Sequence, residues 1–200
     1  MVWEISWHEF LGMGGNVMFP LIAVALLLSF CILERLLFFG ELRSKSDITP
    51  DEVIEHLASG STEQYAGNGI NRRLCTRLIH AKKRYGGLDI MVLNEAKKGI
   101  VIELKKNFTL IAALITVAPL LGLLGTVTGM IRTFFVMNIS GTGNVKAMSS
   151  GISEAMITTQ FGLVIAILGL GAQTIIARHA RRAETAVEEL IRHIIRKFNL

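Results

Sequence analysis

Residues 108–135, which read FTLIAALITVAPLLGLLGTVTGMIRTFF, decide the fold of this chain. The stretch carries one charged residue, Arg132, close to its end. About 20 apolar residues of α-helix cross the hydrocarbon core of a bilayer, which is roughly 30 Å thick. We therefore predict that residues 108–135 form a transmembrane helix.

Two further stretches have the same character, at residues 17–39 and at residues 154–177. The chain is 51% hydrophobic and 18% charged, with a mean hydropathy of +0.49, which is more apolar than a soluble domain of this length. The segment before the first stretch, MVWEISWHEF, lacks the basic residues of a secretory signal, so we expect that helix to be retained. The prediction is an all-α integral membrane protein with three transmembrane helices that extend into the cytoplasm.

The basic residues predict how the chain is oriented. Residues 40–107 hold twelve of the 21 Lys and Arg residues and residues 178–200 hold six, whereas residues 1–16 hold none and residues 136–153 only Lys146. Basic loops stay on the cytoplasmic side of a membrane. We therefore expect residues 1–16 to be a periplasmic N-terminal segment, 40–107 a cytoplasmic helical insert, 136–153 a periplasmic loop and 178–200 a cytoplasmic C-terminal helix.

The two cytoplasmic segments have helical patterns. Residues 88–106 are predicted to form a helix that can run without a break into the second span. Residues 178–198 carry an apolar stripe at helical spacing, which predicts an amphipathic helix packed on its neighbours or on a sister subunit. The stripe comprises Val187, Leu190, Ile191, Ile194, Ile195 and Phe198.

Small residues gather on one side of the second span, within about a third of the helix circumference. They comprise Pro119, Gly122, Gly125, Thr126, Gly129 and Thr133. The third span has a matching side with Thr158, Gly162, Ala166, Gly169 and Gln173, and Thr159 lies on its flank. Small residues let membrane helices approach closely, so helix packing is one interpretation of both faces. The other is that the two faces line a narrow polar path between subunits.

Polar residues in the spans also have two interpretations each. A threonine can be a neutral hydrogen-bond partner for a proton carrier, or it can bond back to its own helix. Glu154 can stand at a pore mouth, or can stabilise the start of a helix, where the dipole favours an anion. Arg132 can reach the membrane interface or form an ion pair with Glu154.

Other classes of function find little support in the sequence. The five histidines are scattered over polar segments, and the two cysteines have no metal-ligand spacing, so we expect neither an enzyme nor a metal or other cofactor. The net charge of +5 is explained by topology, and we expect no nucleic-acid binding. A proton-moving chain needs an ionisable group in mid-membrane. No Asp lies in any predicted span, so we expect a partner to supply that group.

The segments APLLGLLGTVTGMIRTF (118–134) and GISEAMITTQFGLVIAI (151–167) resemble the paired signature of the MotA/TolQ/ExbB proton channel family. Three predicted spans and a short insert favour ExbB or TolQ over the four-span MotA proteins, and the compact chain favours ExbB, with TolQ next. Two positions depart from the family pattern: Leu168 stands where a Pro is frequent, and Gln160 where a small residue is usual.

The resemblance implies a multi-pass protein of the bacterial inner membrane that forms an oligomeric helical ring, expected to be a pentamer. The ring would surround the single helices of an ExbD- or TolR-like partner that carries the membrane Asp, with a TonB- or TolA-like protein downstream. It also implies that Thr126, Thr159, Thr158 and Glu154 line the proton pathway. The expected function is a proton-channel or motor subunit that energises TonB-dependent outer-membrane import. A TolQ-like role in envelope integrity and a non-conducting membrane scaffold are the alternatives.

Overall fold

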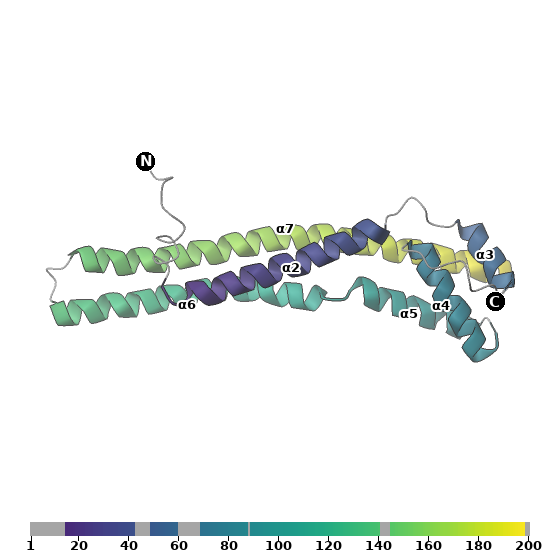
Figure 1. Ribbon diagram of the computed structural model, residues 1–200, viewed down its shortest axis with the longest axis horizontal. Helices are drawn as coiled ribbons and strands as arrows, with labels where there is room; N and C mark the ends of the chain where they lie inside the picture. The colour runs from purple at the N-terminus through teal and green to yellow at the C-terminus, as the bar shows by residue number, and fades with distance from the viewer. Residues whose placement is uncertain (1–14, 43–48, 60–68, 88, 141–144, 199–200) are drawn as a thin grey trace. The chain divides into compact units, whose positions relative to one another are not determined.

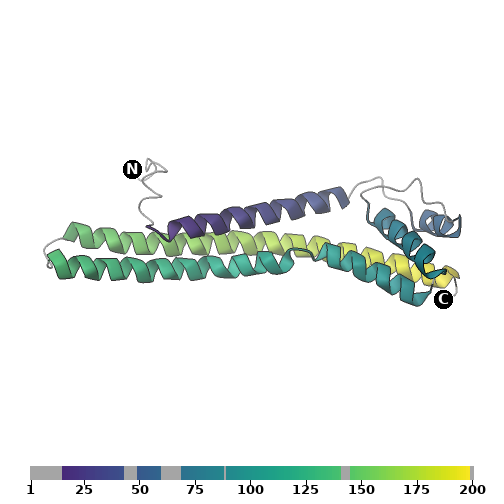
Figure 2. The same cartoon turned by 60° about the horizontal axis from the view of Figure 1, so that its bottom comes forward.

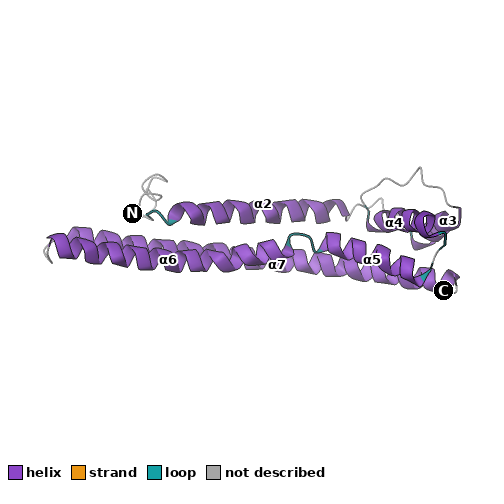
Figure 3. Ribbon diagram, turned by 90° about the horizontal axis from the view of Figure 1, so that it is seen from below, coloured by secondary structure: helices purple, strands orange, loops and turns teal. Residues whose placement is uncertain are grey.

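The computed structural model describes residues 15–42, 49–59, 69–87, 89–140 and 145–198. All regular structure in these residues is helical (Figures 1 and 3). The helices are α2 (Met18–Leu42), α3 (Pro50–Ser59), α4 (Ile70–Tyr85), α5 (Ile90–Leu104), α6 (Phe108–Ser140) and α7 (Val145–Phe198). The predicted segment 1–16 lies outside the described residues, except for its last two positions.

Within the described residues, three helical stretches are long and apolar enough to cross a membrane. They are Met18–Leu42, Ile90–Ile139 and Met148–Phe198, and they contain almost all of the three predicted spans. The chain is therefore an all-α integral membrane protein. The helices α6 and α7 reach further than predicted, since both extend into the segment 136–153 that was expected to be a loop.

The contacts divide the chain into two compact units. Unit 1 takes the chain up to Ile32 together with Thr109–Gln173, and unit 2 takes Leu33–Phe108 and the chain from Thr174 onward. Unit 1 thus holds the first part of α2, nearly all of α6 and the first part of α7. Unit 2 holds the end of α2, the helices α3 to α5 and the end of α7.

In unit 1, α6 and α7 run side by side (Figures 1 and 2). A small core joins them to α2 and comprises Leu28, Cys31, Ile111, Ile115 and Ala166. Large apolar side chains such as Phe30, Leu120 and Ile167 are more than half exposed, which suits a surface that faces lipid or other helices. Both departures from the family pattern, Gln160 and Leu168, also lie at this surface.

In unit 2, short helices pack around the end of α7. Four members of the predicted apolar stripe, Val187, Leu190, Ile191 and Ile194, are buried, whereas Ile195 is half-buried and Phe198 exposed. Apolar residues of α3, α4 and α5 are buried in the same unit, among them Leu57, Leu78 and Leu93. The ion pairs Lys97–Glu188 (2.7 Å) and Lys105–Glu184 (3.1 Å) lie beside this core.

The ends of the short helices follow from local sequence. Thr49 and Glu52 form a capping box around Pro50 at the start of α3, with Thr49 N to Glu52 Oε2 at 3.1 Å. Helix α4 ends at Gly86, whose φ of 77° lies in the left-handed region that glycine tolerates best. The Gly86 N–H donates to Lys82 O at 2.9 Å and so satisfies one of the last carbonyls of the helix.

The helix expected to continue from residue 88 into the second span is interrupted. Helix α5 ends at Leu104, the residues Lys105–Asn107 form a turn, and α6 begins at Phe108. Asn107 has a φ of 64°, which lies outside the range of a continuous α-helix. A side chain from α2, Arg35, contacts backbone carbonyls at this interruption, as described below.

Candidate functional site

The small-residue faces of α6 and α7 meet each other within one chain. An added Cβ at Gly162 would lie 2.6 Å from Ala118 O, and one at Gly122 would lie 3.0 Å from Thr159 Cα. An added Cβ at Gly129 would lie 2.8 Å from Ala155 Cβ, and one at Gly125 would overlap the side chain of Thr158. The two backbones can approach this closely only because these positions lack side chains. We call this contact the glycine seam.

Gly169 and Pro119, both singled out from the sequence, lie at the edge of the glycine seam. An added Cβ at Gly169 would lie 2.7 Å from Ile115 Cγ1 and 2.9 Å from Leu28 Cδ2, so this glycine makes room for α2 as well as α6. Pro119 lies inside α6, directly after the Ala118 carbonyl that faces Gly162. Proline has no N–H, so Pro119 cannot make the helical bond to residue 115.

The three threonines differ in where their hydroxyl groups donate. Thr126 Oγ1 donates to Leu123 O at 2.7 Å, and Thr158 Oγ1 to Ala155 O at 2.9 Å, so both bond to their own helices. Thr159 Oγ1 instead donates across the seam to Gly122 O at 3.0 Å. Thr158 is fully buried, whereas Thr126 and Thr159 are half-buried. In the single chain, Thr158 is therefore part of the packed seam, and Thr126 and Thr159 keep an accessible side.

Glu154 lies where three segments of unit 1 meet. Its Oε2 is 3.1 Å from Arg132 Nη1, and the Glu154 side chain is 17% exposed, against 68% for Arg132. The other carboxylate oxygen occupies the space that a Cβ of Gly15 would need, just before α2 begins. Gly15 also has a φ of 60°, so a larger residue there would be strained as well as crowded. The Glu154 carboxylate thus contacts both α6 and the start of α2.

Glu34 and Arg35 lie near the end of α2 and contact the residues between α5 and α6. Arg35 is 2% exposed. Its Nη2 donates to Glu103 O at 2.9 Å and its Nε to Lys106 O at 2.6 Å. Glu34 Oε2 accepts from Asn107 Nδ2 at 3.0 Å. The sequence does not reveal these contacts. Arg35 binds backbone carbonyl groups, which every residue has, so no residue type between α5 and α6 marks the partner of a buried arginine.

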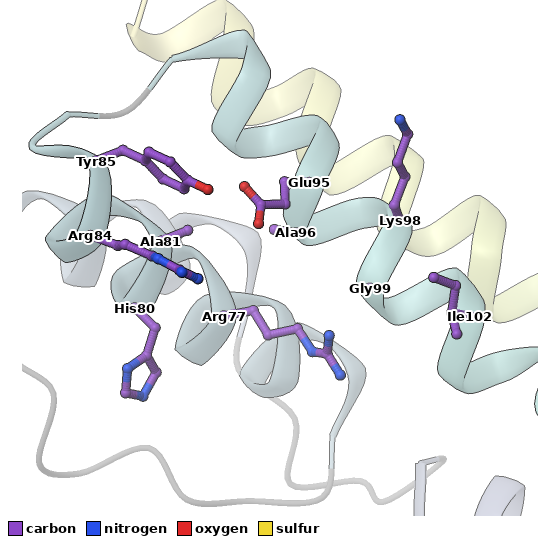
Figure 4. A pocket seen from close by; sticks show the side chains of 10 residues that line it. All are labelled: Arg77, His80, Ala81, Arg84, Tyr85, Glu95, Ala96, Lys98, Gly99 and Ile102. Carbon is purple, nitrogen blue, oxygen red and sulfur yellow. The ribbon is translucent and has the colours of Figure 1, made fainter.

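A groove of about 440 Å³ lies between α4 and α5 in unit 2 (Figure 4). The residues that line it include the small residues Ala81, Ala96 and Gly99 and the larger Arg84 and Tyr85. The hydroxyl of Tyr85 points toward Glu95, whereas His80 points away from α5 (Figure 4). The groove is therefore lined by small apolar residues and by side chains of both charges, and no predicted site residue lies in it.

Burial raises the pKa of the Cys75 thiol to about 11, so the thiol stays protonated at neutral pH. In the residues that the structure describes, no group of three or more His, Cys, Asp or Glu side chains could hold a metal ion.

These features define a class of protein: an integral membrane protein with three long apolar helices, two of them joined by a glycine seam with threonines at its edge. The family model for the MotA/TolQ/ExbB proton channel family matches residues 73–189, which is more than half of the chain and includes all of α6. The chain belongs to the MotA/TolQ/ExbB proton channel family.

Its relatives are named for ExbB. The chain is 32% identical over 164 residues to a Synechocystis protein named biopolymer transport protein ExbB-like 3, with 78% of each chain covered. It is 35% identical to ExbB-like 1 of the same organism, covering 78% of this chain and 65% of that protein. It is 39% identical to the biopolymer transport protein ExbB of Helicobacter pylori over 33% of this chain and 46% of the relative, so it spans less than half of that protein. Within the family, the chain is most like ExbB.

Proposed function

We propose that this protein is a proton-channel or motor subunit of a bacterial inner-membrane complex that uses the proton motive force to energise TonB-dependent outer-membrane import. The observation that carries the proposal is the match of the proton channel family model across α6 and most of α7, which contain Thr126 and Thr159. The names of the relatives favour an ExbB-like role over a TolQ-like role in envelope integrity. The protein has no catalytic site of its own in this proposal.

The proposed assembly is a homo-oligomeric ring, a pentamer, around a single-span partner of the ExbD or TolR type, with a TonB- or TolA-like protein downstream. The N-terminus lies in the periplasm and the C-terminus in the cytoplasm, in keeping with the uneven distribution of Lys and Arg. The exposed apolar side chains of unit 1, such as Phe30 and Ile167, offer a surface for lipid and for neighbouring subunits. The ring needs a partner, since this chain has no Asp in its spans.

The hydrogen bonds of the two threonine hydroxyl groups indicate whether they bind the partner Asp as a neutral acid or as a carboxylate. A threonine hydroxyl has one donor and two acceptor lone pairs. The hydroxyl hydrogens of Thr126 and Thr159 are already given to Leu123 O and Gly122 O. What remains is an acceptor, which suits a protonated carboxylic acid and repels a carboxylate. In the proposal, Thr126 and Thr159 therefore hold the partner Asp while it is neutral.

Each step of the cycle has a defined energy source. A proton that crosses the membrane supplies about 2.3 kcal/mol per 100 mV. Loss of the proton turns the partner Asp into a carboxylate, which the two threonines no longer favour. The ring and the partner helices then move relative to each other. Glu154, with its carboxylate held by Arg132, is proposed to stand at the periplasmic mouth of this path.

The test is the double variant Thr126→Val and Thr159→Val, assembled with the partner protein. The acid is neutral in this proposal, so leaving its O–H without an acceptor costs about 1–3 kcal/mol, which corresponds to a fall of roughly fivefold to 150-fold in proton-driven import. Thr128→Val is the matched control, because Thr128 is an exposed residue of α6 whose hydroxyl bonds to its own helix at Leu124 O. Unchanged import in the double variant, with the complex intact, would show that the two threonines do not hold the partner Asp.

A non-conducting scaffold is the second candidate, and one observation favours it. The glycine seam uses most of the small-residue faces inside a single chain, and Thr158 is fully buried there. A scaffold would assemble with its partner and show no proton flux in sealed vesicles. A motor subunit would show flux that disappears when the membrane Asp of the partner is replaced.

A further inference from the structure

We propose that Arg35 is a positioning residue that creates the interruption between α5 and α6 and keeps the second membrane helix starting at Phe108. The interruption comprises Lys105, Lys106 and Asn107, which we call the joint. Arg35 comes from α2, about seventy residues earlier in the chain, and is almost completely buried. Lys105 and Lys106 are good helix formers, and Asn107 tolerates a positive φ, so the joint permits a break without requiring one.

The carbonyl groups that Arg35 binds are the ones that a continuous helix would use. In an unbroken helix, Glu103 O would accept from the Asn107 N–H and Lys106 O from the Leu110 N–H. In the structure, Arg35 donates to both carbonyls, through Nη2 and Nε. A guanidinium has five donors in a fixed fork and can bridge two carbonyls, which a single ammonium cannot do in the same way. Arg35 therefore supplies a donor to Lys106 O, and adds one at Glu103 O, which also accepts from the Lys106 N–H at 3.4 Å.

Neighbouring side chains hold both Arg35 and the joint. The guanidinium carbon lies 5.1 Å from the centre of the Phe38 ring and 6.0 Å from that of Phe108, so aromatic faces cover the buried charge. Glu34 accepts from Asn107, the residue with positive φ. Glu34 thus contacts the joint at the side chain of Asn107, and Arg35 contacts it at the carbonyl of Lys106. We call these contacts of Glu34 and Arg35 the latch.

The latch has a consequence for the channel, and this part rests on the proposed function. If the joint rewound, residues 90–139 would form one helix, and every residue after the joint would turn and shift along the helix axis relative to α5. Thr126 belongs to this stretch, so its placement depends on where α6 begins. We therefore infer that the latch is needed for proton flux as well as for the joint.

Hydrogen exchange of the full chain in lipid nanodiscs tests the joint directly. In Arg35→Met, which keeps the length of the side chain without its donors, amides 105–110 should exchange about tenfold more slowly, because they enter a continuous helix. Arg35→Lys should lie between wild type and Arg35→Met. Arg84→Met is the control, since Arg84 is an exposed arginine of α4 at the rim of the groove. Unchanged exchange at the joint would overturn the proposal, and so would a loss of protection throughout α5, which would show that Arg35 only supports packing.

A second pair of variants keeps the test informative if Arg35→Met does not fold. Glycine tolerates the positive φ of residue 107, whereas alanine disfavours it and favours a continuous helix. Asn107→Ala should therefore exchange more slowly at the joint than Asn107→Gly. Equal exchange in the two variants would contradict the idea that the interrupted joint competes with a continuous helix.

Proton flux through the complex with its partner tests the second part. Arg35→Met should lower the flux about tenfold while the complex stays assembled, a change equal to 1.4 kcal/mol. Slower exchange at the joint with full flux would overturn the link between the latch and the channel. An absence of flux in the wild-type complex would contradict the proposed function and leave the exchange result intact.

Discussion

In unit 1, α6 and α7 touch through glycine, alanine and threonine, while leucine, isoleucine and phenylalanine lie at the surface. In unit 2 the arrangement is reversed: Leu57, Leu78 and Leu93 are inside, and charged residues form ion pairs at the edges. Burial of apolar area stabilises helices in water. Lipid provides no such gain, so helices there associate by close packing of small residues and by hydrogen bonds. Unit 1 is thus packed as helices are in lipid, through small residues, and unit 2 as helices are in water, through buried apolar side chains.

The largest effect that separates the two units is expected from Leu78→Ala in α4. Leu78 is completely buried in unit 2, so its truncation removes apolar contact and leaves a cavity. The free energy of unfolding of unit 2 should fall by about 3 kcal/mol. Thermal unfolding of the purified protein, followed by helix signal, measures it. Ile102→Ala in α5 is the control, because Ile102 is 72% exposed, and an equal loss in both variants would contradict a conventional apolar core.

The next effect is expected in unit 1, where a larger side chain in the glycine seam, rather than a smaller one, should lower the stability. In Gly162→Ala the new methyl group would lie 2.6 Å from Ala118 O, and backbone cannot move away as easily as a side chain. The variant should lose about 2 kcal/mol of stability in detergent. Gly171→Ala in the same helix has nothing within 4 Å of the added methyl group and should be neutral or slightly stabilised. Similar melting temperatures for the two variants would mean that the seam is not closely packed.

A smaller effect is expected at the ion pairs of unit 2. Glu103 pairs with Arg73 and with Arg77, the latter at 2.8 Å, and all three side chains are partly exposed. Glu103→Gln should cost about 1 kcal/mol or less, and the loss should shrink as salt is added. Glu95→Gln, at an exposed position of α5, serves as the reference. A loss that is large and independent of salt would point to a buried role for Glu103.

The last effect is absent at neutral pH and appears only at high pH. The raised pKa of Cys75, about 11, means that the folded state keeps the thiol proton after the unfolded state has lost it. The contribution of Cys75 is therefore fully present below the ordinary thiol pKa of 9.0 and is lost as pH rises from about 9 to 11. Cys75→Ala should remove this part of the pH dependence. Maleimide labelling of Cys75 that is as fast as that of an added surface cysteine at Met91, which is 78% exposed, would contradict the burial.

Much of the fold could be predicted because it depends on composition and period. Apolar length alone located the three membrane helices, and the spacing of Val187, Leu190, Ile191 and Ile194 indicated a buried stripe. The family signature could also be read directly, since the glycines and threonines that carry it lie within two short segments, 118–134 and 151–167. The site residues are known less well: the sequence put Thr126, Thr158 and Thr159 on two helix faces but could not say which bond each hydroxyl makes.

That choice depends on what another helix brings near. Thr158 and Thr159 are neighbours in the chain, yet one donates to its own helix and the other across the seam to Gly122 O. Arg35 shows the same principle at larger range, because its guanidinium ends α5 at carbonyls about seventy residues away. Hydrophobic period is a property of one segment and can be read from its letters. Hydrogen-bond partners are a property of two segments in contact, so only their packing decides where a hydroxyl donates and where a helix stops.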